Sequence, residues 1–187
     1  MSVTYRDGVN IREKNMLKSL LKPTAVIAIG MAMSANLLAA DIARSDRSFL
    51  EAAAHAGHTE VEGSKLAQTK AANSDVKAFA DTMIKDHTKV GEELDQLAAS
   101  KNVKVPVEPS ITQKAKLKLL GAYNGANFDK HYASEIGVSA HEDAVKLFRK
   151  AVKDAKDPEI KAFAEKTLPG LEHHLEMAKS LASTTAK

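Results

Sequence analysis

Four stretches of the sequence place an apolar or small residue at every third or fourth position, and this pattern limits the fold more than any other feature. Alternate steps of four and three residues trace it through residues 49–67, 76–97, 138–152 and 160–181. Such spacing keeps the side chains on one face of an α-helix and is typical of helices that pack side by side. Aromatic residues are only 4% of the chain and Trp is absent, which also favours helices. The sequence therefore predicts an all-α protein.

Residues that start or interrupt helices support these boundaries. Asp157 followed by Pro158 predicts an N-cap and a first-turn proline for the fourth helix. For the first helix, Asp46 or Ser48 is the candidate N-cap. Pro169 lies inside the fourth stretch, where its missing backbone donor predicts a kink.

The connection between the second and third predicted helices is much longer than the others. It contains KNVKVPVEPS, whose two prolines break the helical pattern, then ITQKAKLKLLGAY, which predicts one short helix, and then the turn-like NGAN. A connection of this length can carry the chain back along the molecule, so that the second and third helices run parallel. We therefore expect a four-helix bundle with one long crossover that carries a short extra helix.

Residues 1–40 have the features of an export signal. Lysines precede an apolar and small-residue run that ends at Ala40, where we expect cleavage. The alternative is a membrane anchor, but glycine and polar residues interrupt the run and leave it short for a span. We expect a periplasmic protein with one domain over residues 41–187 and no stable membrane span after cleavage. Met16 also opens a complete signal, so residues 1–15 are a candidate mis-assigned start.

Removal of this segment makes the chain neutral. Residues 1–40 hold five of the 27 Lys and Arg residues and two of the 24 Asp and Glu residues, which leaves 22 of each sign. With no excess or block of basic residues, no nucleic-acid partner is expected. A homo-oligomer or an envelope partner stays open. Cysteine is absent, so any metal ligands must be His, Asp or Glu.

One ionisable residue interrupts each apolar stretch near its middle: Glu60, His87, His141 and His174. Packing the four helices together would bring these residues to one layer, where unpaired burial would cost several kcal/mol each. Three imidazoles and a carboxylate are suitable ligands for Zn, Cu, Fe or Ni. Asp86, beside His87, is a candidate to join the site or to orient an imidazole. These five residues are the predicted metal site, and no organic cofactor is indicated.

The alternative is a non-enzymatic structural or interaction bundle in which this polar layer only sets the register of the helices. The residues by themselves leave both interpretations open. The sequence contains no GxSxG, no glycine-rich phosphate loop and no HExxH, so no reaction is indicated.

Several segments resemble a family of exported bacterial proteins known as domain of unknown function 4142. The similar segments are FLEAAAHAGHTEVEGSKLA, VKAFADTMIKDHTKV, FDKHY, SAHEDAVKLF and KAFAEKTLPGLEHHLEMA, within about Phe49 to Leu181. The resemblance implies a ferritin-like four-helix fold, with family positions at Glu60, Asp86, His87, Asp129, Tyr132, His141, Pro169 and His174. The biochemical role of this family is unsettled, and we expect a function in metal handling or envelope stress. Ferroxidase activity is not implied, since no histidine here has the glutamate three residues earlier that di-iron members of the ferritin-like group use.

Overall fold

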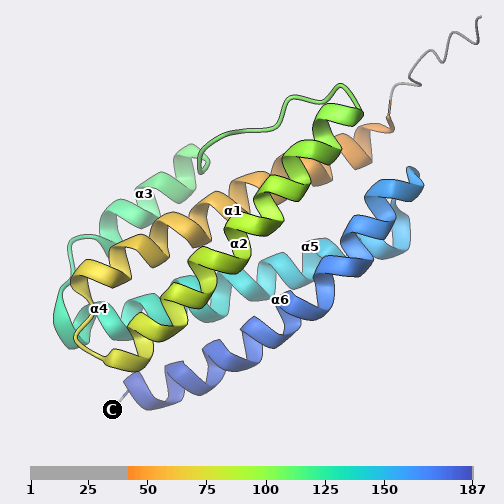
Figure 1. Cartoon of the computed structure of the whole chain (residues 1–187). Coiled ribbons are helices and arrows are strands. Elements are labelled where there is room, and N and C mark those ends of the chain that lie inside the picture. The colour runs from red at the N-terminus through yellow and green to blue at the C-terminus, as the bar shows by residue number, and fades with distance from the viewer. Residues whose placement is uncertain (1–41, 187) are drawn as a thin grey trace, which may run out of the picture. The chain divides into compact units, whose positions relative to one another are not determined.

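The protein is all-helical over residues 42–186, the part that the computed structural model describes (Figure 1). No strand occurs in this range, which confirms the predicted all-α class. The expected signal at residues 1–40 lies outside it. The described elements are α1 (Arg44–Lys70), α2 (Ser74–Ser100), α3 (Ile111–Leu120), α4 (Gly125–Tyr132), the π-helix η1 (Ala133–Ser139), α5 (Ala140–Asp154) and α6 (Pro158–Thr185).

Two antiparallel hairpins make up most of the described chain. The first is α1 and α2, and the second pairs α6 with α4, η1 and α5, which follow one another without a gap. Residues 101–124 join the hairpins and return along α1, with the predicted short helix present as α3. As Figure 1 shows, this return makes α2 and the α4–α5 segment run in the same direction.

The second helix of each hairpin begins with nearly the same sequence. VKAFAD at residues 76–81 of α2 corresponds to IKAFAE at residues 160–165 of α6. A side-chain cap precedes each: Asn73 accepts from the amide of Asp75 at 2.7 Å, and Asp157 accepts from the amides of Glu159 and Ile160 at 2.9 and 3.1 Å. The predicted cap at Asp157 is thus confirmed. The two hairpins therefore start their second helices by the same local chemistry.

Neither Asp46 nor Ser48, the two predicted candidates, caps α1, because both lie inside the helix. Asp46 lies in the first turn of α1, whose N-cap position, Ala43, has no side-chain hydrogen bond. The buried Asp46 carboxylate instead accepts from the amides of Lys156 and Asp157, at 3.0 and 2.7 Å, in the turn before α6. It satisfies amide donors that a helix N-terminus leaves free, but those of a different helix.

Asp129 makes the equivalent connection from α4. Its buried carboxylate accepts from the amides of Ala72 and Asn73, at 3.1 and 3.0 Å, in the turn before α2. We call Asp46 and Asp129 the end clamps, because each ties one hairpin to the turn of the other. In Figure 1 the two turns lie at opposite ends of the α1–α6 assembly.

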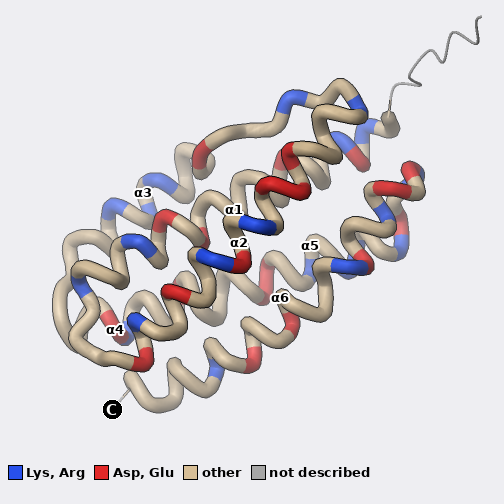
Figure 2. Tube along the Cα trace, viewed as in Figure 1, with Lys and Arg blue, Asp and Glu red and all other residues tan. Residues whose placement is uncertain are grey.

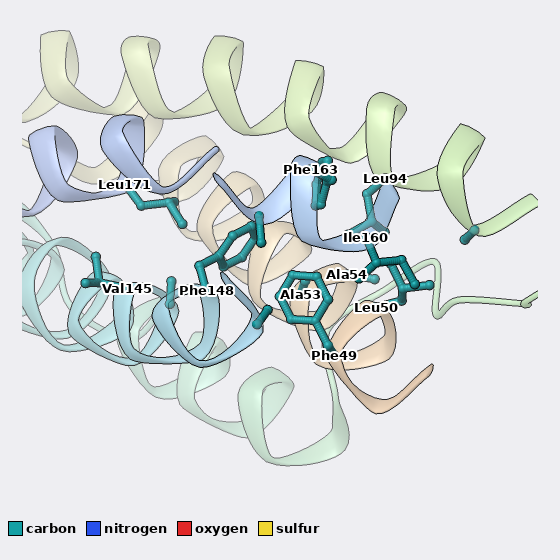
Figure 3. Close-up of a cluster of buried hydrophobic side chains, with 14 of the residues drawn as sticks. Phe49, Leu50, Ala53, Ala54, Leu94, Val145, Phe148, Ile160, Phe163 and Leu171 are labelled. Atoms are coloured by element: carbon teal, nitrogen blue, oxygen red, sulfur yellow. The ribbon is translucent and has the colours of Figure 1, made fainter. Parts of the chain in front are cut away.

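The apolar core consists of two clusters. One is built on Phe49, Phe148 and Phe163, with Phe49 and Phe148 in edge-to-face contact at a centroid distance of 5.1 Å (Figure 3). The other contains Phe79 and Tyr132, 6.2 Å apart. In α1, α2 and α5 the residue that interrupts the apolar pattern falls between the two clusters along the chain. In α6, His174 lies at the end of the first cluster, just before Leu175. A polar layer therefore divides the core.

The surface of the described helices carries both charges. Figure 2 shows Lys and Arg interspersed with Asp and Glu along the helices. Within residues 42–186, no helix is both long and apolar enough to cross a membrane. Helix α6 continues through Pro169, and the kink expected there stays a prediction.

Candidate metal centre

The four residues that interrupt the apolar pattern are all buried in the polar layer. Glu60 of α1, His87 of α2, His141 of α5 and His174 of α6 have exposed fractions of 1%, 4%, 0% and 7%. Asp86 lies at the edge of the layer, with 44% of its side chain exposed. The four residues that interrupt the apolar pattern thus come together from four different helices.

The three imidazoles form a tight cluster. Their ring centroids are 5.3 Å apart for His87 and His141, 5.3 Å for His87 and His174, and 5.7 Å for His141 and His174. One nitrogen of each ring lies within 4.8 Å of the corresponding nitrogens of the other two. Among residues 42–186, this is the group of side chains whose spacing suits a metal ion.

The backbone of η1 fixes the tautomer of His141. The Nδ1 atom of His141 is 3.1 Å from the carbonyl oxygen of Ile136. Because a carbonyl can only accept, Nδ1 must carry the proton, and Nε2 of the neutral ring keeps its lone pair. Ile136 belongs to the π-helix, an irregularity that often marks functional sites and that the sequence did not reveal.

Glu60 orients His87 from the outer side of the ring. The Nδ1 atom of His87 donates to Oε2 of Glu60 at 2.9 Å, which leaves Nε2 directed at Nε2 of His141, 3.3 Å away. Burial disfavours both charges, but their attraction and their hydrogen bond outweigh it, so that the pKa of Glu60 is lowered and the pKa of His87 is raised. A protonated His87 can then donate from Nε2 to His141.

His174 is held by Asp86. Its Nε2 donates to Oδ2 of Asp86 at 3.1 Å, while its buried Nδ1 has no hydrogen-bond partner among the described residues. Burial, followed by the nearby charge of His87, lowers the pKa of His174 to about 4. The ring is therefore neutral at pH 7, and Nδ1 keeps a lone pair whose burial without a partner costs about 1–3 kcal/mol.

This donor set fits a transition metal. Each ring gives one nitrogen to an acceptor behind it, which is Glu60, the Ile136 carbonyl or Asp86. The second nitrogen of each ring is available to a metal ion, which would displace the proton that the protonated His87 carries there. Three histidines with such outer acceptors are characteristic of zinc and related sites. The predicted ligand roles of all five residues stay predictions, but the geometry places the carboxylates of Glu60 and Asp86 behind the rings.

Two of the remaining family positions and two of the other histidines have structural contacts. Asp129 is an end clamp, and the buried Tyr132 hydroxyl is hydrogen-bonded to Ser64 at 2.8 Å. His55 and His58 contact the crossover, at 2.8 Å from the carbonyl oxygen of residue 108 and 3.1 Å from that of residue 106. These residues hold the chain around the centre and do not join it.

Fold and site together define an all-helical protein with a buried three-histidine cluster. A family model described as Domain of unknown function (DUF4142) matches residues 32–181, so the chain belongs to this family and the resemblance seen in the sequence is confirmed. No curated protein and no solved structure matches the chain significantly.

Proposed function

We propose that this protein binds one transition-metal ion between His87, His141 and His174. The observation that carries the proposal is the unpartnered, buried Nδ1 of His174 beside two rings whose outer nitrogens are already bonded. The ligand atoms would be Nε2 of His87, Nε2 of His141 and Nδ1 of His174. Glu60 and Asp86 then act as acceptors that fix the rings.

The nature of the ligands limits the choice of ion. Neutral imidazoles suit Zn, Cu, Fe or Ni, whereas Mg and Ca prefer oxygen ligands. Depending on its identity, the bound ion would supply Lewis acidity or one-electron redox chemistry. The chain's own contribution is to orient three rings and to keep the layer between two apolar clusters.

The proposed fold is a ferritin-like four-helix bundle with one long crossover. This assignment is supported by the parallel course of α2 and the α4–α5 segment and by the return of residues 101–124 with α3. The ligand set differs from that of di-iron members, because a cluster of imidazoles replaces bridging carboxylates. We propose a single ion and a role in metal handling or envelope stress, in the periplasm.

A purely structural role for the polar layer is the competing function. It would require a satisfied network, but Oε1 of Glu60 and Nδ1 of His174 have no hydrogen-bond partner among the described residues. The end clamps also hold the hairpins in register at both ends, without help from the layer. If the layer served register alone, replacing its four residues by apolar ones would leave stability unchanged or higher.

Metal analysis of the full-length protein, isolated from the cell envelope without an affinity tag, tests the proposal. We expect about one ion per chain in the wild type and in His173→Ala, a matched control because the exposed His173 precedes His174 in α6. The double variant His87→Ala, His141→Ala should bind none while keeping its helical circular dichroism. Equal metal content in the wild type and the double variant would exclude the site.

A further inference from the structure

The three-histidine centre has a pocket beside it that reaches two of its three rings. The pocket lies between α2 and α6, has a volume of about 220 Å³, and is lined by both His87 and His174. His141 is fully buried and does not line it. A tetrahedral ion with three protein ligands keeps one open coordination position. We expect a fourth ligand to reach that position from the α2–α6 pocket, because this pocket is lined by two of the three ligand rings.

We propose that a small anion of a few atoms reaches the metal through this pocket and occupies the fourth coordination position. The inference rests on the proposed function, since it needs the ion in place. The volume is below the range of about 300–1,000 Å³ that is usual for drug-sized ligands, so the pocket suits a smaller molecule.

Charges at the pocket favour an anion. A divalent ion bound by three neutral imidazoles would bring two positive charges next to the buried carboxylate of Glu60, and the remaining positive charge would attract an anionic fourth ligand. Of the acids in the lining, Glu93 is paired with Lys166 at 2.7 Å and Asp86 accepts from His174 at 3.1 Å. The exposed Lys89 also belongs to the lining. Lys166 therefore balances the charge of Glu93. Lys89 offsets the charge of Asp86, whose own partner His174 is a neutral ring.

A second pocket offers a matched comparison. It lies between α1 and α2, has a volume of about 290 Å³, and touches His87 but neither of the other two rings. Each pocket has a helical glycine of α2 or α6 in its wall, Gly170 of α6 in the α2–α6 pocket and Gly91 of α2 in the α1–α2 pocket, which also includes Gly57 of α1. A Cβ atom added at either glycine meets nothing within 4 Å, so both positions tolerate a side chain.

The two glycines allow either route to be blocked without harm to the fold. Glycine is the least favourable residue in a helix interior apart from proline, so Gly170→Phe and Gly91→Phe should fold at least as well as the wild type. The experiment loads each protein with Co²⁺, titrates it with azide, and follows the visible absorption of the ion. Metal affinity is measured for each protein in a separate competition with a chelator.

We expect azide to change the Co²⁺ spectrum of the wild type and of Gly91→Phe alike. In Gly170→Phe, azide should bind at least about tenfold more weakly or more slowly, with Co²⁺ affinity unchanged. The inference would be overturned if azide left the spectrum of the loaded wild type unchanged, or if Gly91→Phe alone impaired azide binding. Failure of the wild type to bind Co²⁺ would instead refute the proposed function, and the inference with it.

Discussion

Replacement of Glu60 by Gln tests whether this carboxylate orients a ligand or is itself a ligand. The change keeps the size of the side chain and one acceptor oxygen, but it removes the charge that lies 2.9 Å from Nδ1 of His87. Loss of an acceptor behind a metal-bound histidine typically weakens metal binding about 10- to 100-fold. This corresponds to about 1.4–2.8 kcal/mol, since each tenfold change is about 1.4 kcal/mol.

The same substitution has a smaller effect on the metal-free protein than the loss of a buried ion pair usually has. Stranding a buried charge costs about 3–5 kcal/mol. Here His87 can release its proton once Glu60 no longer raises the pKa of the ring, so no charge is left unpaired. We expect the free energy of unfolding at pH 7.5 to fall by about 1.5–3 kcal/mol, the range for one hydrogen bond to a charged group.

Two measurements on Glu60→Gln give the answer. Competition with a chromophoric chelator gives the Zn²⁺ affinity, and urea unfolding of the metal-free protein gives its stability. The control is Ser64→Ala, one turn further along α1, which removes the partner of the buried Tyr132 hydroxyl and leaves the hydrogen bonds of the three imidazoles in place. The control should lose stability by about 1–3 kcal/mol and keep its Zn²⁺ affinity. Unchanged affinity in Glu60→Gln would refute the orienting role, and complete loss of binding would show that Glu60 is a ligand.

Three further predictions follow from the clamps, the helix cap and the charge of the cluster. Asp129→Asn should lower the free energy of unfolding measured by urea titration by about 3 kcal/mol, because one of the two oxygens that accept from Ala72 and Asn73 becomes an NH₂ donor. Zn²⁺ affinity measured by chelator competition should be unchanged. Asp157→Ala should cost about 1 kcal/mol at pH 7 through loss of the cap of α6. Burial acts to raise the pKa of Asp157, but hydrogen bonds from Lys101 and the α6 amides outweigh it and lower the pKa. The stability advantage of the wild type over Asp157→Ala should therefore persist above about pH 4 and disappear as the pH falls further. Unfolding curves at several pH values would show this loss. Zn²⁺ affinity should rise by up to about tenfold per pH unit over the range in which His87 is protonated, because the ion must displace a proton from this ring, whose pKa is raised. Calorimetry in buffers of different ionisation enthalpy should detect the released proton.

The sequence was sufficient to predict the helices and the residues that meet in the polar layer. Each of these follows from a local period, so that His87 and His174 could be assigned to a buried face without knowledge of their partners. The role of Asp46 was predicted wrongly, because an acid near a helix start usually caps that helix. Its true partners are the amides of Lys156 and Asp157, 110 and 111 residues away, and no local pattern indicates them.

Two other features were beyond local patterns. The π-helix η1 has no distinctive composition, yet it places the Ile136 carbonyl behind His141. The helical pattern predicted that Glu60 and His87 lie in the same layer, but it could not show which ring nitrogen of His87 faces the carboxylate. The identity of that nitrogen decides whether Glu60 is placed to orient a ligand or to bind the metal. The correspondence of VKAFAD and IKAFAE is readable in the sequence, but its meaning as two similar hairpin starts became clear only from the caps at Asn73 and Asp157.

The end clamps have a consequence for how an ion would enter and leave. Zinc fingers assemble their ligands only as the metal arrives, so that losing the ion unfolds them. Here Asp46 and Asp129 join the two hairpins at both ends of the assembly, and their hydrogen bonds do not depend on an ion in the polar layer. Uptake and release of the ion therefore need not be coupled to folding, which suits a reversible exchange of metal with the surroundings better than a permanent structural ion.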